Sequence, residues 1–162
     1  MIHEIKNSII KHKLTQLRRK ETPSKDFRAL VEDVAALLTY EVGKNFETHT
    51  VEIETPIQSC RAEFLDEKNF VVVPILRAGL AMTSGVLKIL PNASVGHIGL
   101  YRDEVTFAPV EYCFKIPPRI NEKILLVVDP MLATGGSASA ALKLLKDSGA
   151  KKIFRAPLSF RS

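Results

Sequence analysis

Residues 70–76 form an unbroken apolar run, Phe70-Val71-Val72-Val73-Pro74-Ile75-Leu76. Apolar residues without alternating polar ones are typical of a strand that is covered on both faces of its sheet. A second run, Lys123-Ile124-Leu125-Leu126-Val127-Val128, follows later in the chain. Buried strands of this kind occur in parallel sheets whose two faces carry helices. The two runs therefore predict an α/β domain.

Helices are expected on either side of these strands. One follows the first strand, from Ala78 to Leu90, and another follows the second strand, from about Gly136 to Ser148. Residues 9–20, and a longer segment with Ser24 as its N-cap, predict an N-terminal helical region. Apolar residues recur in the longer helix at intervals of three and four and predict one core-facing stripe. The stripe consists of Phe27, Leu30, Val31, Val34, Leu37 and Leu38.

The remaining segments complete a strand and helix order. Residues 49–54 alternate in polarity, which is typical of a half-buried strand or hairpin arm. Residues 94–101 are strand-like, residues 102–121 have an irregular pattern, and a last strand begins at Lys151. This order predicts a mostly parallel central sheet flanked by helices. We expect residues 1–162 to form a single domain, because no repeat or linker divides them.

Composition excludes several classes of protein. With 46% hydrophobic and 25% charged residues, the chain has the balance of a globular domain and not of a disordered one. No apolar run approaches the roughly 20 residues that cross a membrane. The first residues contain no apolar signal core, so we expect a soluble cytoplasmic protein without membrane contact.

The charge, cysteine and histidine patterns do not indicate a nucleic-acid site, a disulfide framework or a zinc site. The net charge is +5, but the densest basic segment, residues 11–20, contains no aromatic side chain on which a base could stack. We therefore expect no nucleic-acid binding. Cys60 and Cys113 do not amount to a disulfide framework. The four histidines lack the spacing of a zinc site.

Two strand-to-helix junctions carry the residues best suited to ligand binding. Arg77 and Gly79 follow the first strand, and Asp129 to Ser137 follow the second. In open α/β sheets, ligands bind beyond the carboxyl ends of the strands. Gly135 and Gly136 permit conformations that direct backbone N–H groups at an anion, and they open a helix. The second junction is therefore a candidate phosphate site, unless it is a plain turn that Thr134 caps.

The second junction also resembles a known motif. Residues 127–137 are similar to the 5-phosphoribosyl-1-pyrophosphate (PRPP) site of type I phosphoribosyltransferases. The form Asp-Pro-Met-Leu-Ala-Thr-Gly-Gly-Ser at residues 129–137 resembles uracil phosphoribosyltransferases in particular. Three further segments are similar to that family and occur in its order: residues 11–14, 74–80 and 101–104. The resemblance extends from about residue 3 to about residue 153, and it implies the type I phosphoribosyltransferase fold with a mobile, β-rich lid or arm.

The resemblance implies a role for each candidate residue. One continuous segment would hold the ribose hydroxyls and 5-phosphate of PRPP: Asp129, Pro130, Met131, Leu132, Ala133, Thr134, Gly135, Gly136 and Ser137. Arg77 and Arg102 would bind pyrophosphate, which a planar guanidinium can grip with two hydrogen bonds. Arg102 and Asp129 are the candidate catalytic residues. Mg²⁺ would bind mainly through PRPP itself, with no dedicated protein ligands.

The family reaction converts uracil and PRPP into UMP and pyrophosphate in pyrimidine salvage. Residues 103–118 resemble the mobile loop that covers the site and excludes water. The resemblance also implies a homodimer or higher homo-oligomer, with GTP as an activator.

Residues 153–162 depart from the family pattern, which continues into an apolar strand and a Gly-Pro-Gly-rich segment that recognises uracil. Arg155 and Pro157 are unfavourable in a central strand, and the chain contains no segment that we could assign to uracil binding. We therefore expect a shortened C-terminal part and impaired activity. Two alternatives stay open: a non-catalytic PRPP- or nucleotide-binding regulatory relative, and a phosphoribosyltransferase for another base.

Overall fold

The computed structural model describes residues 5–103, 105–106, 108–131 and 135–157. Its helices are α1 (Ser8–Arg18), α2 (Ser24–Gly43), α3 (Leu80–Ile89) and α4 (Gly136–Asp147). Its strands are β1 (His49–Glu54), β2 (Ser59–Phe64), β3 (Phe70–Leu76), β4 (Ser94–Val95), β5 (His97–Arg102), β6 (Pro109–Lys115), β7 (Ile124–Asp129) and β8 (Lys152–Pro157). Short 3-10 turns precede β3 and β7, at Glu67–Asn69 and Ile120–Glu122.

The central sheet has the strand order β6-β5-β3-β7-β8, with the short β4 beside β3. β3 pairs in parallel with β5 and with β7, and β7 pairs in parallel with β8. Only the edge strand β6 runs antiparallel to its neighbour among these described strands. The predicted α/β class with a mostly parallel sheet is therefore confirmed.

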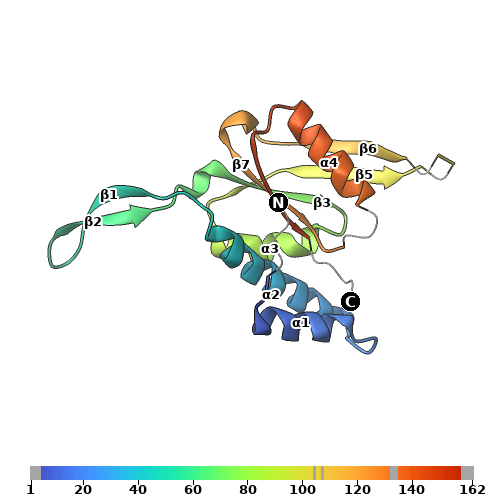
Figure 1. Ribbon diagram of the computed structural model, residues 1–162, viewed down its shortest axis with the longest axis horizontal. Helices are drawn as coiled ribbons and strands as arrows, with labels where there is room; N and C mark the ends of the chain where they lie inside the picture. The colour runs from blue at the N-terminus through green and yellow to red at the C-terminus, as the bar shows by residue number, and fades with distance from the viewer. Residues whose placement is uncertain (1–4, 104, 107, 132–134, 158–162) are drawn as a thin grey trace.

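Helices cover both faces of this sheet, as Figure 1 shows: α1, α2 and α3 lie on one side and α4 on the other. Alternate residues of β3 pack against the helices on opposite faces of the sheet. Phe70 and Val72 belong to the core cluster under α2 and α3, whereas Val71 and Val73 belong to the cluster under α4. All four side chains are at most 1% exposed. This double burial explains why the strand has an unbroken apolar sequence.

The stripe predicted for α2 is confirmed in its centre and differs at its start. Val31, Val34 and Leu38 are buried, but Phe27 is 39% exposed. Ser24 is the first helical residue and not the N-cap. Pro23 occupies the cap position, because its carbonyl accepts the first helical hydrogen bond, from the N–H of Phe27 at 2.8 Å.

Residues 102–121 are not irregular throughout, because they contain β6. This strand pairs with β5 from His97↔Lys115 to Arg102↔Pro109, with a register shift at Gly99. A turn between Asp103 and Ala108 joins the two strands. The sequence did not reveal β6 because its side chains are exposed or only partly buried, so they carry no apolar period.

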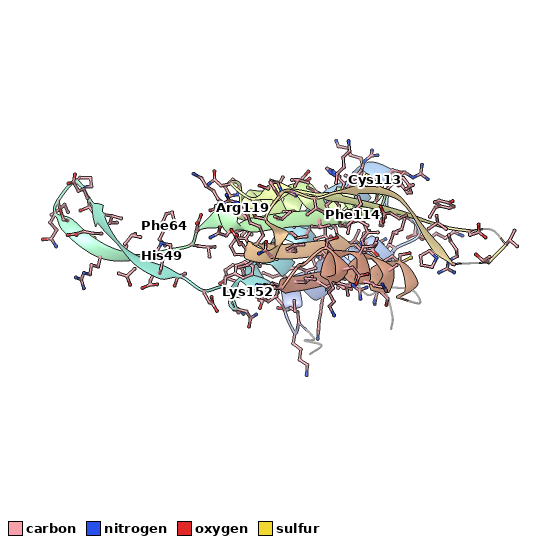
Figure 2. All side chains as sticks on the ribbon, turned by 90° about the horizontal axis from the view of Figure 1, so that it is seen from above. His49, Phe64, Cys113, Phe114, Arg119 and Lys152 are labelled. Atoms are coloured by element: carbon pink, nitrogen blue, oxygen red, sulfur yellow. The ribbon has the colours of Figure 1, made fainter. Side chains whose placement is uncertain are left out.

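The alternating segment 49–54 does form a hairpin arm, but it is not half-buried. β1 pairs with β2 from His49↔Phe64 to Glu54↔Ser59. The arm projects away from the sheet (Figure 1), and Figure 2 shows His49 and Phe64 on it, with ring centroids 5.6 Å apart. Val51 and Ala62 are the only strand residues of the arm that are less than exposed. At its base, Lys152 of β8 pairs with Glu47 at 3.1 Å.

Two expectations from composition can be compared with the structure. Within the described residues, no helix combines the length and the apolar character that crossing a membrane requires. Cys60 is exposed and Cys113 is partly buried, and both are free thiols.

Candidate active site

The turn after β3 places Arg77 at the carboxyl end of the sheet. The N–H of Gly79 donates to the carbonyl of Ile75 at 2.9 Å, and α3 begins at the next residue. The peptide bond between Leu76 and Arg77 is cis. Arg77 is exposed, whereas Gly79 is buried. The chain turns tightly because Gly79 lies against backbone: an added Cβ would come within 2.6 Å of the Val128 carbonyl oxygen.

Asp129 ends β7, an interior strand between β3 and β8, and is only 9% exposed. Its Oδ1 accepts a hydrogen bond of 3.2 Å from the N–H of Met131. Burial raises the pKa of the Asp129 carboxyl, while the Met131 N–H and the positive charge of Arg155 act in the opposite direction. A buried carboxylate with few protein hydrogen bonds is suited to accept hydrogen bonds from a bound ligand.

The loop after Asp129 leads into α4 through two glycines. Gly135 is the N-cap of α4 and has a φ of 80°, a left-handed conformation that favours glycine. The first turn of α4, from Gly136 onward, lies within the described residues and contains no acidic side chain. Ser137 is exposed there. The helix N-terminus is therefore available to an anion. Leu132, Ala133 and Thr134, which belong to the predicted cradle, lie outside the described residues.

Arg102 ends β5, where the β5–β6 turn begins. It is exposed, and it pairs in register with Pro109. The turn itself is held by Asp103, whose Oδ1 accepts the N–H groups of Val105 and Thr106 at 3.0 and 2.7 Å. These N–H groups and the Thr106 hydroxyl lower the pKa of Asp103. Asp103 therefore has a structural role in a turn that starts directly beside Arg102.

The described candidate residues meet at one edge of the sheet. β5, β3 and β7 are adjacent and parallel, so Arg102, Arg77 and Asp129 all lie at their carboxyl ends. The N-terminus of α4 follows β7 at the same edge. The prediction that both junctions lie beyond the carboxyl ends of parallel strands is confirmed.

Sequence reasoning missed two features near this edge. Tyr101 and Tyr112 form an exposed aromatic pair across β5 and β6, with ring centroids 6.3 Å apart. No sequence signal could find this pair, because it depends on the β5–β6 register. The sequence marks Arg155 only as an unfavourable strand residue, whereas in the structure its charge acts on Asp129.

A cavity of about 320 Å³ lies elsewhere, at the amino ends of β3, β7 and β8. Glu47, Asp66 and Lys152 are among its lining residues, and none of the predicted site residues is. Its acidic and basic side chains are mixed, and Lys152 is paired with Glu47. We therefore place the candidate active site at the carboxyl edge and not in this cavity.

Comparison with known proteins identifies the family of this chain. The family model of uracil phosphoribosyltransferase matches residues 4–157. The chain belongs to the uracil phosphoribosyltransferase family. It is 56% identical over 152 residues to the uracil phosphoribosyltransferase of Clostridium kluyveri, covering 94% of this chain and 73% of that relative. It is 51% identical over 153 residues to that of Dictyoglomus thermophilum, covering 94% and 74%.

Solved structures agree with the family assignment. The AQ2163 protein of Aquifex aeolicus superposes with a TM-score of 0.91 at 35% identity, covering 97% of this chain and 75% of that one. A purine phosphoribosyltransferase of Pyrococcus horikoshii superposes with a TM-score of 0.57 at 17% identity, covering 82% and 77%. The second likeness shows the fold alone, and both support the predicted type I phosphoribosyltransferase fold.

The buried Asp129 carboxyl predicts a pH-dependent stability change in Asp129→Asn. Because burial raises the pKa of Asp129 in the folded state, the folded protein binds a proton more readily than the unfolded chain. Stability is therefore lost as pH rises from the ordinary aspartate pKa through the raised one. Asparagine keeps an acceptor for the Met131 N–H and has no charge to bury.

We expect the melting temperature of Asp129→Asn, relative to that of the parent, to rise as pH rises through the raised pKa of Asp129. Below the pKa of an unfolded aspartate the difference should be constant, because Asp129 is protonated there in the folded and the unfolded state. Thermal unfolding of both proteins between about pH 3 and pH 8 measures this difference. A difference that is independent of pH, or that falls as pH rises, would contradict the cost of burying this carboxylate.

Proposed function

We propose that the chain transfers the phosphoribosyl group of PRPP to uracil, forming UMP and pyrophosphate. The observation that carries this proposal is the family match over residues 4–157, with curated relatives named for this activity at 51–56% identity. The common edge of Arg77, Arg102 and Asp129 supports it, because phosphate- and sugar-binding groups are needed side by side. The relatives favour this function over the regulatory and other-base alternatives.

The ribose and its phosphate would bind at the end of β7. Oδ1 of Asp129 accepts the Met131 N–H, and Oδ2 accepts no hydrogen bond within the described residues, so it can accept one from a ribose hydroxyl. The 5-phosphate would bind at the N-terminus of α4, where Gly135, Gly136 and Ser137 supply backbone N–H groups and a hydroxyl. Pro130, Met131 and the three residues outside the described part complete the proposed cradle.

Arg77 and Arg102 would bind the pyrophosphate. As the bond between ribose C1 and the pyrophosphate oxygen breaks, positive charge develops on the ribose and negative charge on the leaving group. The two guanidinium groups stabilise that negative charge. A uracil nitrogen then forms the new bond to C1 and gives up its proton to the released pyrophosphate or to water. The anchored ribose and phosphate hold C1 in place for this step. Arg102 and Asp129 are the residues that we propose as catalytic.

Mg²⁺ fits this arrangement as an ion that is held mainly by PRPP. Among the described residues, no group of three His, Cys, Asp or Glu side chains could hold a metal ion. Mg²⁺ commonly binds through substrate phosphates and water, so this arrangement needs no dedicated carboxylate cage. When bound, Mg²⁺ neutralises charge on the pyrophosphate.

The finer properties of the family are part of the proposal. The exposed β1–β2 arm, with Ile53 and Phe64 39% and 50% exposed, supports a homodimer or higher homo-oligomer. Activation by GTP stays a prediction from the resemblance, and location in the cytoplasm stays a prediction from the sequence.

The test is release of pyrophosphate from Mg-PRPP by the 162-residue chain, with uracil and separately with other bases. Release with uracil alone would support the proposal. Release with another base would favour the other-base alternative. If a folded sample releases none with any base, the catalytic proposal is wrong for this chain.

Arg77→Ala should weaken PRPP affinity at least about tenfold and leave the fold intact, because a charge-assisted pair is lost from an exposed side chain. Isothermal titration calorimetry with Mg-PRPP measures the affinity. Arg61→Ala is the matched control: Arg61 is an exposed arginine on β2, far from the carboxyl edge in sheet topology. Equal affinity of Arg77→Ala and Arg61→Ala would contradict the role of Arg77.

A further inference from the structure

Arg155 lies on the same face of the sheet as Asp129. In the parallel pair of β7 and β8, Arg155 is opposite Val127, so their side chains point to the same side. Val127 belongs to the core cluster under α4, and Ile153, two residues before Arg155, packs against that cluster. Asp129 is two residues after Val127 and therefore shares this face. The register thus makes Arg155 the diagonal neighbour of Asp129 on the next strand.

The guanidinium of Arg155 lacks the partners that a buried charge normally has. Nε and Nη2 are both buried, and neither makes a hydrogen bond within the described part of the chain. Burying an unpaired charge is costly unless another charge compensates it. The Asp129 carboxylate, the diagonal neighbour of Arg155 on the same face, is the charge in position to compensate it, and Arg155 acts to lower the pKa that burial raises.

Other elements around Asp129 supply little competing charge. The first turn of α4, all of it described, contains no acidic side chain. The charged residues of α4 lie toward its other end, where Lys143 pairs with Asp147 at 2.6 Å. Arg77, in the turn after β3, is exposed to solvent, which screens its charge. Arg155 is the cation that shares the buried face with Asp129.

We propose that Arg155 is a positioning residue whose positive charge keeps Asp129 ionised and thereby ready to accept ribose hydroxyls. The consequence for PRPP binding rests on the proposed function. The electrostatic coupling of Arg155 and Asp129 does not, because it exists in the ligand-free protein. An ionised carboxylate offers only acceptors, whereas a protonated one turns one oxygen into a donor and loses part of its acceptor capacity. Without Arg155, only the Met131 N–H would oppose the effect of burial, which favours the protonated form of Asp129.

The test is the pKa of the Asp129 carboxyl, measured by ¹³C NMR in the ligand-free protein. The Asp129 signal is assigned by its absence in Asp129→Asn. Arg155→Met removes the charge at similar length and should shift the pKa of Asp129 upward. Arg155→Lys keeps the charge and should hold the pKa near that of the parent. Asp103 is the internal control, because its pKa depends on Val105 and Thr106 and should stay unchanged in all variants.

An unchanged Asp129 pKa in Arg155→Met would overturn the proposal, as would an equal upward shift in Arg155→Lys. Arg155→Gln, neutral but polar, gives the same measurement where the Met variant does not fold. PRPP affinity as a function of pH then tests the consequence: the acidic limb should move to higher pH in Arg155→Met and not in Arg155→Lys. If the pKa shifts but no variant or parent binds PRPP, the coupling stands and the proposed function fails.

Discussion

Replacing Gly79 by alanine is expected to destabilise the protein by about 2–3 kcal/mol and to abolish PRPP binding. A Cβ at this position would lie 2.6 Å from the Val128 carbonyl oxygen and 2.7 and 2.8 Å from the Ile75 backbone N and O. All three are backbone atoms of β3 and β7, which cannot move aside as a flexible side chain can. The turn that carries Arg77 and the strand end that carries Asp129 must therefore separate.

Urea unfolding and calorimetry with Mg-PRPP measure the two effects of Gly79→Ala. Ala78→Gly is the matched control, because it alters the neighbouring exposed residue of the same turn without adding an atom. We expect the control to stay close to the parent in stability and PRPP affinity. If Gly79→Ala had the stability of the parent, the turn after β3 would not be held tightly against the end of β7.

Gly85→Ala is expected to cost about 3 kcal/mol of stability, because α2 and α3 pack backbone against backbone at this residue. An added Cβ would collide directly with the Glu32 carbonyl oxygen and would lie 2.8 Å from the Ala35 Cβ. Alanine normally favours a helix over glycine, so the sign of the effect separates packing from helix propensity. Relief of the collision requires the two helices to move apart over the sheet.

The control for Gly85→Ala is Gly43→Ala at the end of α2. There an added Cβ would meet only the Phe46 ring, at an ordinary contact distance of 3.8 Å. We expect Gly43→Ala to be neutral or slightly stabilising, since it removes backbone freedom from the unfolded chain. Chemical denaturation of both variants measures the difference. A stabilised Gly85→Ala would refute the close approach of α2 and α3.

The family motif and the strands that carry it could be predicted from sequence because each has a local cause. β3 occupies the residues predicted for it, since burial on both faces demands apolar side chains at every position. Asp129 and Arg77 could be placed at the carboxyl edge because parallel strands end there together. Family resemblance, and not residue pattern, supplied the assignment of roles to these residues.

The strand β6 and the exposed arm could not be predicted in the same way. β6 forms because β5 offers it an open edge, and its residues, from Pro109 to Lys115, do not alternate in burial. The arm alternates like a half-buried strand, yet both its faces are exposed among the described residues. Alternation of polar and apolar residues predicts which side chains share a face of the strand. Whether another element covers that face depends on where the hairpin lies in the folded protein.

The α/β class, the family and the candidate site residues could be predicted from the sequence, because these predictions depend on local apolar periods and on one continuous motif. Contacts between segments that are distant in the chain became visible only in the folded structure. The approach of α2 to α3 at Gly85 and the shared face of Arg155 and Asp129 are of this kind. Both follow from register and helix separation, which packing sets and no local pattern encodes.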